Sequence, residues 1–130
     1  MEPLIYEEES YQIRGAVFHV YNELGLGFLE AVYQEALMRE LYYQKIPFVA
    51  QPQLHIFYRG EKMDQYYKPD FLCYEKIIIE IKAVQSILPE HQAQLMNYLK
   101  VTGCHLGFLV NFSHYPGVKI ERFVNETCWH

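Results

Sequence analysis

The stretch Ile77–Val84 constrains the fold most, because this run of apolar, mainly β-branched residues contains two charges. A run of this kind predicts a strand that is buried on both faces. Side chains alternate along a strand, so Glu80 and Lys82 share one face with Ile78. A buried carboxylate and ammonium cost free energy unless something compensates them. The strand therefore indicates a functional site, although a Glu80–Lys82 ion pair on a half-exposed strand is an alternative explanation.

The segment before this strand contains a candidate partner for Glu80. The pattern of Tyr66–Tyr74 also predicts a strand, and the turn between the two strands is centred on Glu75. In such an antiparallel hairpin Asp70 lies opposite Glu80, and directly opposed Cβ atoms are roughly 4.5–5.5 Å apart. A shift of the turn by one residue would move Asp70 to the other face. In the centred register two carboxylates converge, and a cation that prefers oxygen ligands, Mg²⁺ or Mn²⁺, would remove their repulsion.

Length and composition predict one folded domain spanning residues 1–130. The chain is 51% hydrophobic and 16% aromatic, which argues against disorder. Its three cysteines are widely spaced and form no Cys-x-x-Cys motif, which favours a reduced, cytoplasmic protein over a disulfide framework or a zinc site. The N-terminus does not resemble a signal peptide, and no apolar run approaches the ~20 residues of a membrane helix. We therefore expect no membrane partner.

The formal net charge of −5 limits the functions that the chain can have. Phosphate contacts dominate non-specific binding to duplex DNA, and proteins that bind in this way usually have strongly basic surfaces. The charge therefore argues against promiscuous DNA binding, although a local basic groove would still be able to bind DNA. The twelve tyrosines hint at an interface, so the oligomeric state stays open, with a homodimer among the options.

Two helices are expected before the first strand. The first covers Glu7–Leu24 and begins with acidic residues, which the helix dipole favours at that end. The second covers about Phe28–Gln44. Glu30 lies one turn before Tyr33, within the apolar stripe of this helix, and would point either toward the sheet or, from the edge of the stripe, into solvent. The apolar stripe consists of Leu29, Val32, Tyr33, Ala36, Leu37 and Leu41.

The rest of the chain alternates between strands and one helix. A helix is expected over about Pro89–Val101, and its His91, Gln94 and Tyr98 share one face, either as a ligand-binding set or as a solvated face. Strands are expected at Phe48–Gln51, Leu54–Tyr58, Leu106–Phe112 and Val118–Val124. This order predicts an α/β or α+β domain with a mixed sheet, in which antiparallel strands come first and a parallel strand follows the last helix.

Several of these motifs together resemble a known family. Pro69-Asp70 followed by Glu80-Ile81-Lys82 resembles the Pro-Asp…(Asp/Glu)-x-Lys signature of the PD-(D/E)XK nuclease superfamily. The segment Gln94–Tyr98 is similar to the Gln-x-x-x-Tyr helix of its exonuclease-like branches, and Gly27–Tyr33 matches the motif of the GxxExxY protein family within that superfamily. The resemblance covers about residues 11–124. It implies an α/β, restriction-endonuclease-like core in which helices flank a mixed β-sheet.

The resemblance also implies a metal site. Asp70 and Glu80 would ligate Mg²⁺ or Mn²⁺, and the carbonyl oxygen of Ile81 would be a further ligand. Glu30 would complete the metal shell, either directly or through a water molecule. One metal ion is the simplest assignment, since a second would need additional carboxylates.

Three further residues would act on the substrate or the attacking water. The resemblance implies that Lys82 orients or deprotonates the water and stabilises charge on the phosphate. Gln94 and Tyr98 would position the metal, the lysine or a substrate phosphate. These roles agree with the chemistry, because hydrolysis of a phosphodiester needs an activated water and positive charge against the developing negative charge.

The implied function is metal-dependent hydrolysis of phosphodiester bonds in nucleic acid, with DNA favoured over RNA. A catalytically silent binding or interaction module with the nuclease fold is the alternative, and a hydrolase of small phosphorylated molecules is a third option. An open groove between basic side chains would favour the enzyme, whereas a site sealed by tyrosines would favour the module. The basic residues concerned are Lys68, Lys82, Lys100 and Arg122, and the tyrosines are Tyr66, Tyr67 and Tyr98.

Overall fold

The structure, a computed structural model, describes residues 5–126. The ends of the predicted 1–130 domain and the third cysteine, Cys128, therefore lie outside the described residues. The elements are α1 (Glu7–Leu24), α2 (Glu30–Tyr43), β1 (Phe48–Ala50), β2 (Leu54–Tyr58), β3 (Glu61–Tyr67), β4 (Phe71–Cys73), β5 (Ile77–Lys82), α3 (Pro89–Thr102), β6 (Leu106–Asn111) and β7 (Lys119–Val124).

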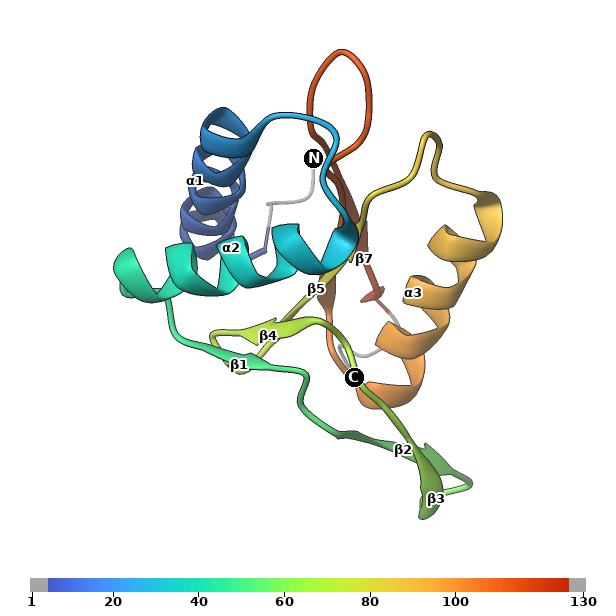
Figure 1. Cartoon of the computed structure of the whole chain (residues 1–130). Helices are drawn as coiled ribbons and strands as arrows, with labels where there is room; N and C mark the ends of the chain where they lie inside the picture. The colour runs from blue at the N-terminus through green and yellow to red at the C-terminus, as the bar shows by residue number, and fades with distance from the viewer. Residues whose placement is uncertain (1–4, 127–130) are drawn as a thin grey trace.

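Strand β5 lies at the centre of a mixed five-stranded sheet with the order β1-β4-β5-β6-β7 (Figure 1). It pairs with β6 in parallel, whereas the other neighbouring strands are antiparallel. Strands β2 and β3 form a separate antiparallel hairpin. Helix α3 connects the parallel pair, because a parallel neighbour requires a crossover. The predicted mixed sheet is therefore confirmed.

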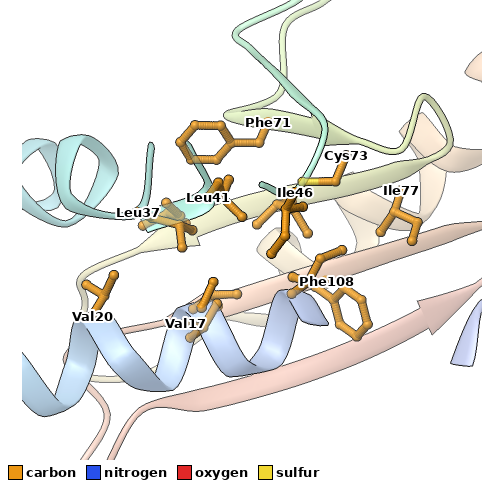
Figure 2. Close-up of a cluster of buried hydrophobic side chains, with 14 of the residues drawn as sticks. Val17, Val20, Leu37, Leu41, Ile46, Phe71, Cys73, Ile77 and Phe108 are labelled. Atoms are coloured by element: carbon orange, nitrogen blue, oxygen red, sulfur yellow. The ribbon is translucent and has the colours of Figure 1, made fainter. Parts of the chain in front are cut away.

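The helices cover both faces of the sheet, with α1 and α2 on one face and α3 on the other (Figure 1). Ile77, Ile79 and Ile81 belong to the larger core cluster with α1 and α2, part of which Figure 2 shows. Ile78 belongs to the smaller cluster on the α3 side, together with Leu95. The alternation predicted for this strand is confirmed, and its two charged residues share the α3 face.

The segment Tyr66–Tyr74 is not the single strand that its pattern predicts. Strand β3 ends at Tyr67 and β4 begins only at Phe71. Pro69 has no N–H to donate to a ladder, and the N–H of Asp70 donates to the Glu80 side chain instead of to a strand. This break separates the β2–β3 hairpin from the main sheet and leaves Asp70 directly before β4.

The predicted apolar stripe of the second helix is only partly correct. Tyr33, Leu37 and Leu41 are buried, but Leu29 is 78% and Val32 is 39% exposed. The helix begins only at Glu30, so Leu29 precedes it, and Val32 lies on its solvent side. The core contribution of α2 is therefore a narrow stripe of residues spaced four apart.

Candidate active site

Asp70 and Glu80 come together as the hairpin register predicts. Strand β4 pairs with β5 so that Phe71 lies opposite Ile79, which brings Asp70 opposite Glu80. The backbone N–H of Asp70 donates to the Glu80 carboxylate at 2.9 Å, and the N–H of Ile81 donates to the Asp70 carboxylate at 2.7 Å. Each carboxylate is thus held by the backbone of the opposite chain segment.

Burial makes both carboxylates difficult to ionise. Desolvation, followed by the charge of Asp70, raises the pKa of Glu80 to about 7. Desolvation also raises the pKa of Asp70, although the hydrogen bond from the Ile81 N–H opposes this shift. The pair therefore carries electrostatic strain that a nearby positive charge would relieve.

Lys82 supplies part of that positive charge without forming an ion pair. Its ammonium lowers the pKa of both Asp70 and Glu80, so it lies within electrostatic range of each. None of the ion pairs between described residues involves Lys82. The alternative explanation of the charged strand, a Glu80–Lys82 ion pair, is therefore not what the structure contains, and the amine remains available for a ligand.

Glu30 lies near the pair but outside the apolar stripe. It is the first residue of α2, where the helix dipole favours a carboxylate, and it is exposed to solvent. Its charge raises the pKa of Asp70, so the two groups interact electrostatically. Within residues 5–126, however, no three His, Cys, Asp or Glu side chains gather closely enough to hold a metal ion.

The loop before α2 explains why Glu30 starts the helix. The hydroxyl of Tyr33 donates to the carbonyl of Gly25, and the N–H of Phe28 donates to that hydroxyl at 3.4 Å. The Tyr33 ring is fully buried and stacks on Phe112 at 4.6 Å between centroids. Gly27 has a φ of 104°, which side chains disfavour. The glycine and tyrosine of the Gly27–Tyr33 motif therefore shape the loop that leads to Glu30.

Tyr67, which the sequence suggests only as one of the tyrosines that would seal the site, is a direct neighbour of the pair. It is 6% exposed, and its ring stacks on Tyr98 with 3.8 Å between centroids. Its hydroxyl meets no strict hydrogen-bond geometry among the described residues, and burial, followed by the nearby Glu80 carboxylate and the charge of Asp70, raises its pKa. One signal was available: Tyr67 is an aromatic residue three positions before Asp70. The stack brings Tyr98 to the site through Tyr67.

Gln94, the other predicted residue of α3, is exposed. It lines a shallow surface depression with Tyr98 and Asn97. No hydrogen bond among the described residues joins it to Asp70, Glu80 or Lys82. The structure therefore does not bring Gln94 into contact with the carboxylates.

Asn111 is a residue to which the sequence analysis assigned no role. It is 1% exposed, and its side-chain amide donates to the Val84 carbonyl at 2.8 Å and accepts from the Val84 N–H at 3.1 Å. Asn111 lies beside Lys82 in the parallel ladder. It therefore fixes the chain as it leaves the lysine.

The surroundings of the site form neither an open groove between the four basic side chains nor a site sealed by all three tyrosines. Tyr67 lies beside Glu80 and stacks on Tyr98, but Tyr66 is 47% exposed. Arg122 lies beside Phe108, which packs on the α1 face, and its guanidinium donates to the Ile5 carbonyl at 3.4 Å. Arg122 is therefore on the opposite face of the sheet from Lys82, so it does not flank a basic groove at the site.

The donors of the pair suit a hard divalent cation. Mg²⁺ is commonly held by one or two carboxylates and completes its shell with water and substrate oxygens. Asp70 and Glu80 are two carboxylates with lone pairs beyond those that the backbone N–H groups use. Their raised pKa values reflect unfavourable burial and repulsion, which a cation would offset.

A mixed sheet between helices, with two carboxylates and a lysine at the centre, defines a restriction-endonuclease-like nuclease fold. The chain belongs to the PD-(D/E)XK nuclease superfamily, whose family model matches residues 7–123. No curated protein sequence matches the chain significantly.

Among solved structures, the chain is similar to an alkaline exonuclease, LHK-Exo, from Laribacter hongkongensis. The TM-score is 0.55, and the alignment covers 98% of this chain and 74% of the exonuclease chain. The sequence identity is 12%, so this similarity supports the fold alone. In the described part of the chain, no helix has the length and apolar character needed to cross a membrane.

Proposed function

We propose that the chain is a metal-dependent nuclease of the GxxExxY group that hydrolyses phosphodiester bonds of nucleic acid, with DNA as its main substrate. The observation that carries the proposal is the Asp70–Glu80 pair with Lys82 within electrostatic range of both. Membership of a nuclease superfamily supports the same chemistry. The net charge of −5 argues for a restricted substrate, such as strand ends or a particular structure.

In this proposal Asp70, Glu80 and the Ile81 carbonyl hold a Mg²⁺ or Mn²⁺ ion, and Glu30 contributes through a water molecule. The cation would supply a Lewis acid and lower the pKa of a bound water. Glu30 is assigned the indirect role because it is exposed and outside any three-acid cluster of the described residues.

Lys82 orients the attacking water and offsets negative charge on the phosphate, since its ammonium lies on the same strand face as Glu80. Tyr98 acts as a positioning residue through its stack on Tyr67. Gln94 is exposed on the same helix, where it contacts a substrate phosphate once nucleic acid is bound.

The test is incubation of purified protein with end-labelled single-stranded, duplex and branched DNA and with RNA, in Mg²⁺, Mn²⁺ or EDTA. We expect cleavage of at least one substrate that depends on metal and is lost in Asp70→Ala and Lys82→Ala. Equal cleavage by the wild type and both variants would identify a contaminant and contradict the proposal.

A catalytically silent binding module remains the second candidate. The observation that favours it is the lack of a three-acid cluster within residues 5–126. Binding of nucleic acid without metal-dependent cleavage of any substrate in the same panel would support the module over the enzyme.

A further inference from the structure

The β2–β3 hairpin extends from the body of the molecule beyond the edge of the main sheet (Figure 1). Every residue of β3 except Tyr67 is exposed. The connection between the strands is Arg59-Gly60, and both residues have positive φ, as in the tight turns of two-residue hairpins. The hairpin is therefore a narrow ribbon with little of its surface buried.

One face of this ribbon packs against the body and the other does not. Leu54 and Ile56 of β2 pack in the core cluster on the α3 side. Alternation therefore turns His55 and Phe57 away from the body, and their rings contact each other with centroids 6.5 Å apart.

The residues opposite them on β3 share this outer face. Tyr66 lies opposite His55, and Lys62 lies opposite Phe57. Phe57 is 51% and Tyr66 is 47% exposed. We call these four residues, His55, Phe57, Lys62 and Tyr66, the outer face of the hairpin. It presents three rings and one ammonium to solvent, and the exposed Asp64 lies between Lys62 and Tyr66 on β3, where the register of the two strands shifts.

The charge of the segment made of the hairpin and the lysine that follows it, Lys68, differs from that of the rest of the chain. Residues 54–68 contain three of the eleven lysines and arginines but only two of the sixteen acidic residues. The cations are Arg59, Lys62 and Lys68, and the acids are Glu61 and Asp64. The segment is therefore slightly basic in a protein whose net charge is −5.

The outer face lies close, along the chain, to the candidate active site. Tyr67 follows Tyr66 and points the other way, into the stack with Tyr98 beside Glu80. Asp70 is four residues after Tyr66, a distance of at most about 13 Å along an extended chain. A strand lying on the outer face would therefore reach the carboxylates within a few nucleotides.

We propose that the outer face of the hairpin binds an unpaired strand of nucleic acid and guides it toward Asp70 and Glu80. Bases would stack on Phe57, Tyr66 and His55, and Lys62 would contact the phosphates. The part of this inference in which the strand is guided toward Asp70 and Glu80 rests on the proposed nuclease function. It adds that the substrate is single-stranded or has a single-stranded end.

The chemistry favours an unpaired strand over a duplex. Aromatic side chains stack only on bases whose faces are accessible, and a duplex hides those faces. A protein with a net charge of −5 also gains little from phosphate contacts alone, so stacking has to supply much of the affinity.

The test is fluorescence anisotropy with a labelled 15-nucleotide oligo(dT), the matching oligo(U) and a blunt duplex of the same length, in EDTA so that no cleavage occurs. Phe57→Ala and Tyr66→Ala should each weaken binding of the single strands by roughly 5- to 150-fold, the range for loss of one stacked base. The duplex should bind more weakly than either strand. Comparison of oligo(dT) with oligo(U) distinguishes DNA from RNA as the source of the strand.

Tyr11→Ala is the matched control, because Tyr11 is a 75% exposed tyrosine on α1, away from the hairpin. It should bind as the wild type does. The logarithm of affinity should fall with the logarithm of salt concentration with a slope no steeper than about −2, since residues 54–68 contain three cations. Thermal unfolding checks that each variant is folded.

Unchanged binding by both hairpin variants, or tighter binding of the duplex, would overturn the inference. The inference would also be overturned if the wild type self-associates, binds no oligonucleotide, and loses its self-association in Phe57→Ala. The outer face would then be an interface between copies of the chain. If the wild type binds single strands but cleaves no substrate, the proposed nuclease function is contradicted. If the hairpin variants then lose single-strand binding, this inference is still supported.

Discussion

The Glu80 carboxylate accepts the backbone N–H of Asp70 at 2.9 Å, across the turn between β4 and β5. This hydrogen bond crosses between the two acidic residues of the candidate site and fixes their separation by backbone geometry. The neighbouring N–H of Ile81 holds the Asp70 carboxylate in the same way. The backbone therefore holds both carboxylates in place before any ligand binds.

Glu80 should make the metal-free protein less stable as the pH rises. Its folded pKa is about 7, against 4.5 for the ordinary group, so the folded state binds more protons than the unfolded state between these values. Stability from this group is complete below about pH 4.5 and is lost as the pH rises through 7. Glu80→Gln should nearly equal the wild type near pH 4.5 and exceed its unfolding free energy by about 3 kcal/mol at pH 8. Chemical denaturation in EDTA at both pH values measures this, and a variant less stable than the wild type at pH 8 would contradict it.

A divalent cation should stabilise the wild type but not a variant without the paired charges. Binding to the folded state alone adds about 2.7 kcal/mol at a hundredfold excess over Kd, which corresponds to roughly 10 °C in Tm for a chain of this length. Asp70→Asn should melt above the metal-free wild type and should not respond to Mn²⁺. Thermal unfolding with and without MnCl₂ measures both values. A wild-type Tm that Mn²⁺ leaves unchanged is the result that counts against a cation site.

Lys82 should be needed for cleavage but not for metal binding. Lys82→Met keeps the length of the side chain and removes the ammonium, so the cleavage rate should fall by roughly 10²- to 10⁴-fold. Mn²⁺ should still raise the Tm of this variant. Lys45→Met, at an exposed lysine beyond the far end of α2, is the control and should cleave normally. Wild-type cleavage rates in Lys82→Met would exclude the proposed role.

Tyr33 should stabilise the fold through its hydroxyl as well as its ring. Tyr33→Phe keeps the stack on Phe112 but loses the hydrogen bond to Gly25, which should cost about 1 kcal/mol, or roughly 4 °C in Tm. Tyr42→Phe, at a 72% exposed position of the same helix, should melt as the wild type does. Equal Tm values for the two variants would show that the buried hydroxyl has no structural role.

The features that follow from local periodicity could be predicted from the sequence. The alternation of Ile77–Lys82 separates its two faces, and a turn centred on Glu75 is sufficient to pair Asp70 with Glu80. The bounds of α1 also agree with the prediction, because its amphipathic pattern and the glycine after Leu24 mark both ends. These features depend only on residues near one another in the chain.

The features that depend on how the elements pack could not be predicted. The helical stripe leaves Glu30 either toward the sheet or in solvent, and its exposure depends on where the loop held by Tyr33 lets α2 begin. The stack of Tyr67 on Tyr98 joins segments that are distant in the sequence. Arg122 lies on the α1 face because of its register with Phe108, which no local pattern specifies.

The most direct test of the central claim is anomalous diffraction from crystals soaked in MnCl₂. We expect an anomalous peak within coordination distance, about 2.0–2.6 Å, of the carboxylate oxygens of Asp70 and Glu80. The peak should be absent from crystals of the Asp70→Asn, Glu80→Gln double variant soaked in the same way. Anomalous density at other acidic residues, with none at this pair in the wild type, would contradict the account.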